Sequence, residues 1–235
     1  MLIDNENTIL FLKSGYTYIT FTEETQELVS EAIQSTRYLF SLPNVVKEEF
    51  HADVNSASYS SGYSRFKNSV HEKWHLSSND FGEKWPTILN DKLIIFKKLT
   101  AVFQSILIPF LDNIATICHI NEKGNLARDL RSGTIRFRLL HYHPATGIGF
   151  DSHIDSGIST LFLNESNQGL QIWENSKWSF VKDFDKKCLL GCAHTLSSLS
   201  AIPPLKHRVC NSGDDRYAIA VFFHANDGKF STLTQ

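Results

Sequence analysis

Cysteine is scarce in this sequence, and neither sign of charge dominates it. The 235 residues contain four cysteines, and no two of them form a C-x-x-C pair. This scarcity excludes a disulfide-built scaffold and argues against a zinc knuckle, so we expect buried thiols in a reducing compartment. Lysine and arginine number 23 against 25 aspartates and glutamates, which gives a net charge of −2. Such a chain offers no general field to nucleic acid or to an anionic membrane, and we expect neither as a partner.

The sequence also lacks a recognisable targeting segment and an uninterrupted apolar run. Its first six residues include Asp4 and Glu6 and show no basic segment followed by an apolar one. We therefore predict no secretory signal and expect a cytoplasmic location. The most apolar window, 101–120, is broken by Gln104, Pro109 and Asp112. These interruptions favour a core helix over a membrane span.

The composition that remains is that of an ordinary globular protein. Hydrophobic residues make up 42% of the chain, including 17 phenylalanines, which is enough for a packed interior. At this length we expect a single domain, 1–235, in which residues 1–132 pack outside the core. Over these residues the patterns predict strands at 8–12 and 16–21, a helix capped by Thr22 and ended by Pro43, and a long helical region from Pro86 to Ile120.

Over residues 133–227 the hydrophobic pattern changes to a period of two. The short apolar runs are separated by turn residues and predict eight strands, at 134–142, 148–154, 159–163, 170–173, 178–181, 188–191, 207–210 and 216–223. Eight short strands in two facing sheets predict a mainly β fold with flanking helices and a double-stranded β-helix, or jelly-roll, core. We expect 133–227 to form this core and to hold any metal site.

Candidate metal ligands lie in this core. His153 and Asp155 are two residues apart, so on a strand they would point to the same face. His207 begins another predicted strand, and Arg216 follows nine residues later. Two imidazoles and one carboxylate on one face of an octahedral ion leave three positions open, which suits non-haem Fe(II) that must bind an organic chelate and O₂. The planar guanidinium of Arg216 could hold the carboxylate of such a chelate in a bidentate manner.

These residues stand in segments that resemble a known family. The segments Gly147–Gly157, Gly169–Gln171, Lys206–Val209 and Arg216–Ile219 look like motifs of the Fe(II)- and 2-oxoglutarate-dependent dioxygenases of the isopenicillin N synthase-like superfamily. The N-terminal half is similar more loosely, as at Ser61–Arg65 and Trp74–Leu76. The resemblance extends over most of the chain and is most specific in the metal motif.

The resemblance implies roles for individual residues. His153, Asp155 and His207 would be iron ligands, and Arg216 would pair with the distal carboxylate of 2-oxoglutarate. A tyrosine should also contact the cosubstrate; Tyr142 is our choice, and His143, directly before Pro144, is the alternative. Where the family has Arg-x-Ser, this sequence has Ala218, which can donate no hydrogen bond.

The implied activity is that of an oxygenase. With Fe(II), 2-oxoglutarate and O₂ as cofactors, such an enzyme oxidises, and by default hydroxylates, a small organic substrate such as an amino acid or a specialised-metabolite intermediate, releasing succinate and CO₂. One alternative is an isopenicillin N synthase-like iron oxidase that does not use 2-oxoglutarate, which Ala218 motivates. The other is a non-catalytic jelly-roll binding protein. The sequence leaves open the substrate, the choice between hydroxylation, desaturation and ring closure, and the oligomeric state.

Further expectations concern the surroundings of the site. Family members usually have a longer N-terminal region, so we expect a less covered site with room for a carrier-tethered substrate. His71 is expected on a loop or helix surface, and His75 could face the substrate. His194 is expected at a turn, and Arg136 and Arg138 are expected to be exposed to solvent rather than to bind substrate.

Overall fold

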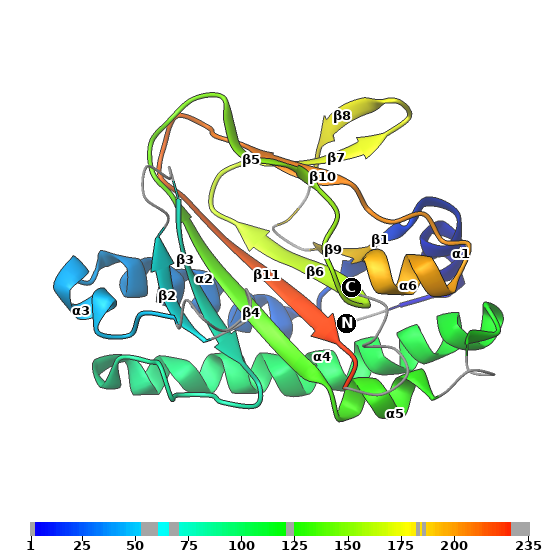
Figure 1. Ribbon diagram of the computed structural model, residues 1–235, viewed down its shortest axis with the longest axis horizontal. Coiled ribbons are helices and arrows are strands. Elements are labelled where there is room, and N and C mark those ends of the chain that lie inside the picture. The colour runs from blue at the N-terminus through cyan, green and yellow to red at the C-terminus, as the bar shows by residue number, and fades with distance from the viewer. Residues whose placement is uncertain are drawn as a thin grey trace.

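Two antiparallel β-sheets face each other, with helices covering the outer face of the larger one (Figure 1). The computed structural model describes residues 3–52, 61–65, 71–120, 125–181, 184 and 187–226. The larger sheet has the strand order β1-β9-β6-β11-β4-β3-β2 and the smaller one the order β5-β10-β7-β8. The strands are β1 (Tyr16–Thr20), β2 (Gly62–Arg65), β3 (His71–Ser77), β4 (Thr134–Tyr142), β5 (Ile148–His153), β6 (Ser159–Glu165), β7 (Leu170–Glu174), β8 (Lys177–Phe180), β9 (Lys187–Cys192), β10 (His207–Cys210) and β11 (Arg216–His224).

The jelly-roll core predicted for the second half is confirmed. All eight strands predicted there are present as β4 to β11, and they divide between the two sheets. Alternation along β4 and β11 separates two faces of the larger sheet. Phe137, Leu139 and Val221 face the helices, whereas Tyr142 and Phe222 belong to a second apolar cluster between the sheets. That the whole chain forms one domain stays a prediction.

The helices of the first half form an outer layer. They are α1 (Asn5–Ser14), α2 (Glu23–Ser41), α3 (Asn44–Glu48), the short 3₁₀ turn η1 (Thr87–Leu89), α4 (Asn90–Ile117) and α5 (Leu126–Arg131), with α6 (His194–Leu199) later in the chain. Helix α2 begins after Thr22, whose hydroxyl accepts a hydrogen bond from the Thr25 amide, as the sequence predicted. Helix α4 is long and apolar enough to cross a membrane, but it packs against α1, α2 and α5 here.

The strand predicted at 8–12 is wrong, because this segment belongs to helix α1. The side chain of Asp4 caps the helix by accepting from the Asn7 amide, the Asn7 side chain accepts from the Asp4 amide in return, and Gly15 ends the helix in a left-handed conformation with φ of 74°. Only Phe11 is buried, while Ile9 is 64% exposed. A run of five residues is too short to distinguish the period of a strand from that of a helix. The capping residues at its two ends therefore decide that it is helical.

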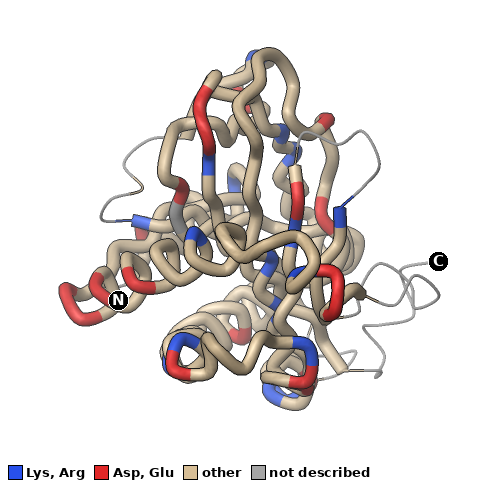
Figure 2. The backbone as a smooth tube through the Cα atoms, turned by 90° about the vertical axis from the view of Figure 1, so that its left-hand side faces the viewer, with Lys and Arg blue, Asp and Glu red and all other residues tan. Residues whose placement is uncertain are grey.

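Charged residues of both signs are spread over the helices and the sheets (Figure 2). This distribution agrees with the small net charge of −2.

Candidate active site

Three side chains predicted as metal ligands converge between the two sheets. His153 lies at the end of β5, His207 begins β10, and the register pairs these two residues directly. The Nε2 atom of His153 lies 3.5 Å from Asp155 Oδ1, and His207 Nε2 lies 3.5 Å from Asp155 Oδ2. One ligand atom from each residue falls within 4.8 Å of the other two. This spacing is wide for hydrogen bonds but fits three donors around one ion.

The surroundings of the three residues prepare them to bind a metal. The Nδ1 atoms of His153 and His207 lie 2.9 Å and 3.2 Å from the backbone carbonyls of Asp151 and Leu205. Since a carbonyl can only accept, each Nδ1 carries a proton, which leaves Nε2 as the ring nitrogen available to a metal. The Thr160 hydroxyl donates to Asp155 Oδ2 at 2.8 Å and holds the carboxylate in place. Such supporting hydrogen bonds are typical of metal centres, and the residues fit Fe(II).

A cavity of about 300 Å³ opens beside this cluster. Its walls are largely apolar, and they include the side chains of Leu140, Phe150, Phe162, Leu170, Val209 and Phe222. Arg216 and Tyr142 also line the cavity, where the register pairs them across β11 and β4. The Arg216 guanidinium lies over the Tyr142 ring, 4.8 Å from its centroid.

Arg216 has an internal carboxylate partner that the sequence analysis missed. Glu165, at the end of β6, forms an ion pair with Arg216 through Nη2 and also accepts from Nε at 3.0 Å. The amides of Gly169 and Leu170 donate to the same carboxylate. The Nη1 atom of Arg216 is buried and has no hydrogen-bond partner among the described residues. One edge of the guanidinium is therefore occupied, and Nη1 is the donor left for a further acceptor, which corrects the expected bidentate grip.

Tyr142 rather than His143 faces this cavity. Burial raises the pKa of Tyr142, so its phenol keeps its proton and can donate to a carboxylate. The Nε2 atom of His143 instead lies 3.6 Å from Glu72, on the other face of the sheet. Ala218 lines the cavity two residues after Arg216, and it adds no polar atom there.

The segment His71–His75 matches the pattern H-E-x-x-H, but it cannot form the helical zinc site of metalloproteases. In this structure the segment is part of strand β3. On a strand, Glu72 points away from His71 and His75, whereas on a helix the two histidines would lie one turn apart. His71 lines the cavity, and His75 accepts a hydrogen bond from Arg138 Nε at 2.9 Å.

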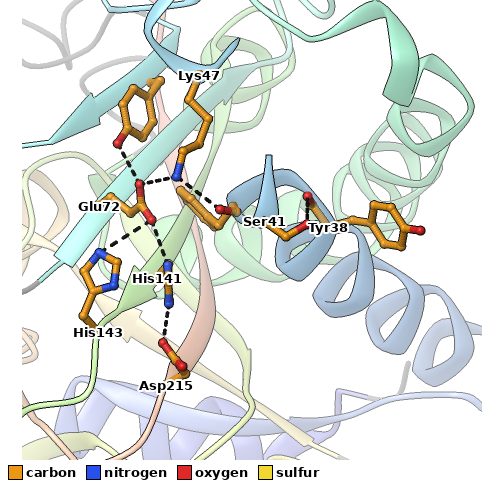
Figure 3. Close-up of polar contacts among 9 residues, drawn as sticks. Tyr38, Ser41, Lys47, Glu72, His141, His143 and Asp215 are labelled. Atoms are coloured by element: carbon orange, nitrogen blue, oxygen red, sulfur yellow. Dashed lines mark hydrogen bonds and ion pairs between the residues drawn. The ribbon is translucent and has the colours of Figure 1, made fainter. Parts of the chain in front are cut away.

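Glu72 is the centre of a second polar cluster, on the helix-facing side of the larger sheet (Figure 3). Its carboxylate accepts from Lys47 Nζ at 2.8 Å, from the Tyr63 hydroxyl at 2.7 Å and from His141 Nδ1 at 2.8 Å. His141 Nε2 lies 2.7 Å from Asp215. These are hydrogen-bond lengths rather than the 3.5 Å spacings of the first cluster, so we interpret the network as structural.

Two expectations about basic residues are wrong. His71 is 7% exposed on β3 rather than on a surface, and Arg138 lines the cavity instead of facing solvent. Arg136 and Arg138 lie two residues apart on β4 and therefore share one face, and that face is turned toward the interior of the barrel. The side chain of His194 is exposed on the first residue of α6, and its backbone amide donates to the carbonyl of Asp155 at 2.8 Å.

Comparisons of the sequence with known proteins agree with this site. The family model of the 2OG-Fe(II) oxygenase superfamily matches residues 133–225. A 2-oxoglutarate-Fe(II) type oxidoreductase of Aspergillus fumigatus is 23% identical over 92% of this chain and 74% of its own length. The 2-oxoglutarate-dependent dioxygenase tropC of Talaromyces stipitatus is 26% identical over 60% of this chain. The match spans about half of that relative's length, 48%.

Solved structures share the fold. The JOX2 structure in complex with 2OG, Fe and JA superposes with a TM-score of 0.80 at 18% identity, covering 94% of this chain and 70% of that one. The complex of the dioxygenase for auxin oxidation 1 from Arabidopsis thaliana with 2-oxoglutarate gives 0.75 at 20% identity, covering 94% and 86%. The prediction from the sequence motifs is thereby confirmed. Residues 133–225 therefore match the 2OG-Fe(II) oxygenase superfamily, and the relatives support an enzyme that uses Fe(II), 2-oxoglutarate and O₂ to oxidise a small organic substrate.

Proposed function

We propose that this oxygenase hydroxylates a small organic molecule held in the cavity between the sheets. In this proposal His153, Asp155 and His207 hold Fe(II), and Arg216 Nη1 with the Tyr142 hydroxyl receives the distal carboxylate of 2-oxoglutarate. The observation that carries it is the convergence of two Nε2 atoms and one carboxylate at 3.5 Å spacing, with both Nδ1 atoms directed at backbone carbonyls. The chemistry supplied by Fe(II) and 2-oxoglutarate, when bound, is oxidative decarboxylation to succinate and CO₂ coupled to substrate oxidation.

The protein's own contribution is positioning and exclusion of water. His153, Asp155 and His207 all line the cavity, so an Fe(II) ion held by them would be accessible to molecules bound there. The aromatic walls, among them Phe150, Phe162 and Phe222, keep this space poor in water. A water-poor space strengthens the interaction of Arg216 and Tyr142 with a carboxylate.

Anaerobic titration with Fe(II) and 2-oxoglutarate tests the proposal. The wild-type protein should develop the visible charge-transfer band of an iron–oxo acid chelate, and it should release succinate when air is admitted. His207→Ala should lose both signals, because it removes one of three ligands. His194→Ala is the matched control and should keep both, since His194 lies on the surface. A wild-type protein with neither band nor succinate would refute the proposal.

We further propose that the enzyme works in the cytoplasm on a freely diffusing or carrier-tethered substrate, without nucleic acid or membrane as a partner. The support for the compartment is the cysteine content: Cys118, Cys188, Cys192 and Cys210 are all free thiols. The support for the partners is the near-balanced charge. Fractionation of cells that express the tagged protein would test the location, and its appearance in the membrane pellet would contradict it.

A further inference from the structure

The cavity contains more positive charge than 2-oxoglutarate needs. Besides Arg216, its lining includes Lys73 and Arg138, from the neighbouring strands β3 and β4. The register pairs Lys73 with Leu140 and His75 with Arg138, so Lys73 and Arg138 are diagonal neighbours on one face of the sheet. Diagonal pairs in an antiparallel sheet lie about 7–8 Å apart at the backbone, within reach of long side chains.

The carboxylates of the cavity are already engaged elsewhere. Among the described residues that line it, the acidic side chains are Asp155 and Glu165. Asp155 belongs to the proposed iron ligands, and Glu165 is paired with Arg216. Lys73 and Arg138 line the same cavity, whose walls are mainly apolar. Burial and the nearby charge of Arg138 together lower the pKa of Lys73 to about 8, since both disfavour the charged form.

Arg138 is held in a fixed orientation. Its Nε donates to His75 Nε2 at 2.9 Å, and its guanidinium lies 4.5 Å from the centroid of the Phe222 ring. A guanidinium whose plane is fixed in this way is suited to a planar anion. Arg138 precedes Tyr142 by four residues on β4, which is about 13 Å along a strand. Its backbone position is therefore separated along the strand from Tyr142, although its charge still acts on that phenol.

We propose that Lys73 and Arg138 form a second anion-binding site in the cavity, separate from Arg216, which binds an acidic group of the substrate. The substrate class is then an organic acid, most simply a carboxylate with an apolar body that packs against the aromatic walls. This inference rests on the proposed oxygenase function, since it assigns the remaining part of the same cavity. The competing assignment is that Lys73 contacts 2-oxoglutarate, because Lys73, Leu140 and Ala218 lie in one cross-strand row.

The test uses pairs of probes that differ only in charge. Phenylacetate and phenylacetamide, and octanoate and octanamide, are titrated anaerobically into the Fe(II)–2-oxoglutarate complex, and binding is followed by the shift of its visible band. We expect the wild-type protein to bind the acids at least about tenfold more tightly than the amides, as one charge-assisted hydrogen bond allows. Lys73→Met and Arg138→Met should each remove this preference and leave amide binding within about twofold. If either variant does not fold, the other carries the test.

Control variants separate the possible failures. Lys177→Met removes the same charge from an exposed position on β8 and should change nothing. Arg138→Lys should keep a reduced preference for acids, because the positive charge remains. Equal binding of acids and amides, or no response to any acid, would overturn the inference while the iron–2-oxoglutarate band itself remains. Loss of 2-oxoglutarate affinity in Lys73→Met would also overturn it, by assigning Lys73 to the cosubstrate.

Discussion

Replacing Glu72 by glutamine should destabilise the fold through the loss of one buried charge. An amide at this position can keep the hydrogen bonds of the cluster. Its oxygen can accept from Lys47 and Tyr63, and its NH₂ group can donate to His141 Nδ1 once that nitrogen gives up its proton, while Nε2 donates to Asp215. What is lost is the negative charge opposite Lys47, whose side chain is 4% exposed.

The expected cost is about 3 kcal/mol, since breaking a buried pair from one side costs about 3–5 kcal/mol and the hydrogen bonds are kept here. Urea unfolding followed by circular dichroism measures it. The double variant Glu72→Gln/Lys47→Met should recover most of the loss, because it removes the uncompensated ammonium as well. A loss below about 1 kcal/mol in the single variant, or a double variant no more stable than the single one, would refute this reasoning.

The same cluster predicts a pH dependence. Although burial opposes ionisation, hydrogen bonds from His141, Lys47 and Tyr63 hold the pKa of Glu72 at about 2, below its usual 4.5. A lowered carboxyl pKa contributes stability that is fully present above pH 4.5 and disappears as the pH falls toward 2. The unfolding free energies of the wild type and Glu72→Gln should therefore converge over this range, and a gap that stays constant would contradict the assignment.

Two further substitutions test the site and the helical layer. Ala218→Ser places a hydroxyl beside Arg216, and a hydrogen bond to a charged acceptor contributes about 1.5–3 kcal/mol, so the Kd for 2-oxoglutarate should fall about tenfold to a hundredfold in anaerobic calorimetry. An unchanged Kd would show that another donor already serves this carboxylate. Pro109 is exposed inside α4, and Pro109→Ala should raise the urea midpoint, because proline costs up to about 3 kcal/mol more than alanine in a helix interior. A lower midpoint would mean that packing needs the shape which Pro109 imposes.

The accuracy of the sequence-based prediction differed between the two halves of the chain. In the second half, alternation over whole strands and turn residues between them located β4 to β11. At 8–12 the apolar run was too short for its period to decide, and capping by Asp4 and Gly15 made it a helix. The H-E-x-x-H motif at His71–His75 is likewise ambiguous in the sequence. It can bind zinc in the metalloprotease manner only on a helix, and here it lies on strand β3.

The sequence by itself predicted the jelly-roll core, because strand alternation is a local property of the chain, and its resemblance to a known family pointed to His153, Asp155 and His207. Only the tertiary structure decided which side of each strand became the barrel interior. That choice placed Tyr142 and Arg138 in the cavity, moved His143 toward Glu72, and set Glu165 against Arg216. These contacts join residues distant in sequence across two packed sheets. Their geometry depends on how the sheets close on each other, which no local pattern encodes.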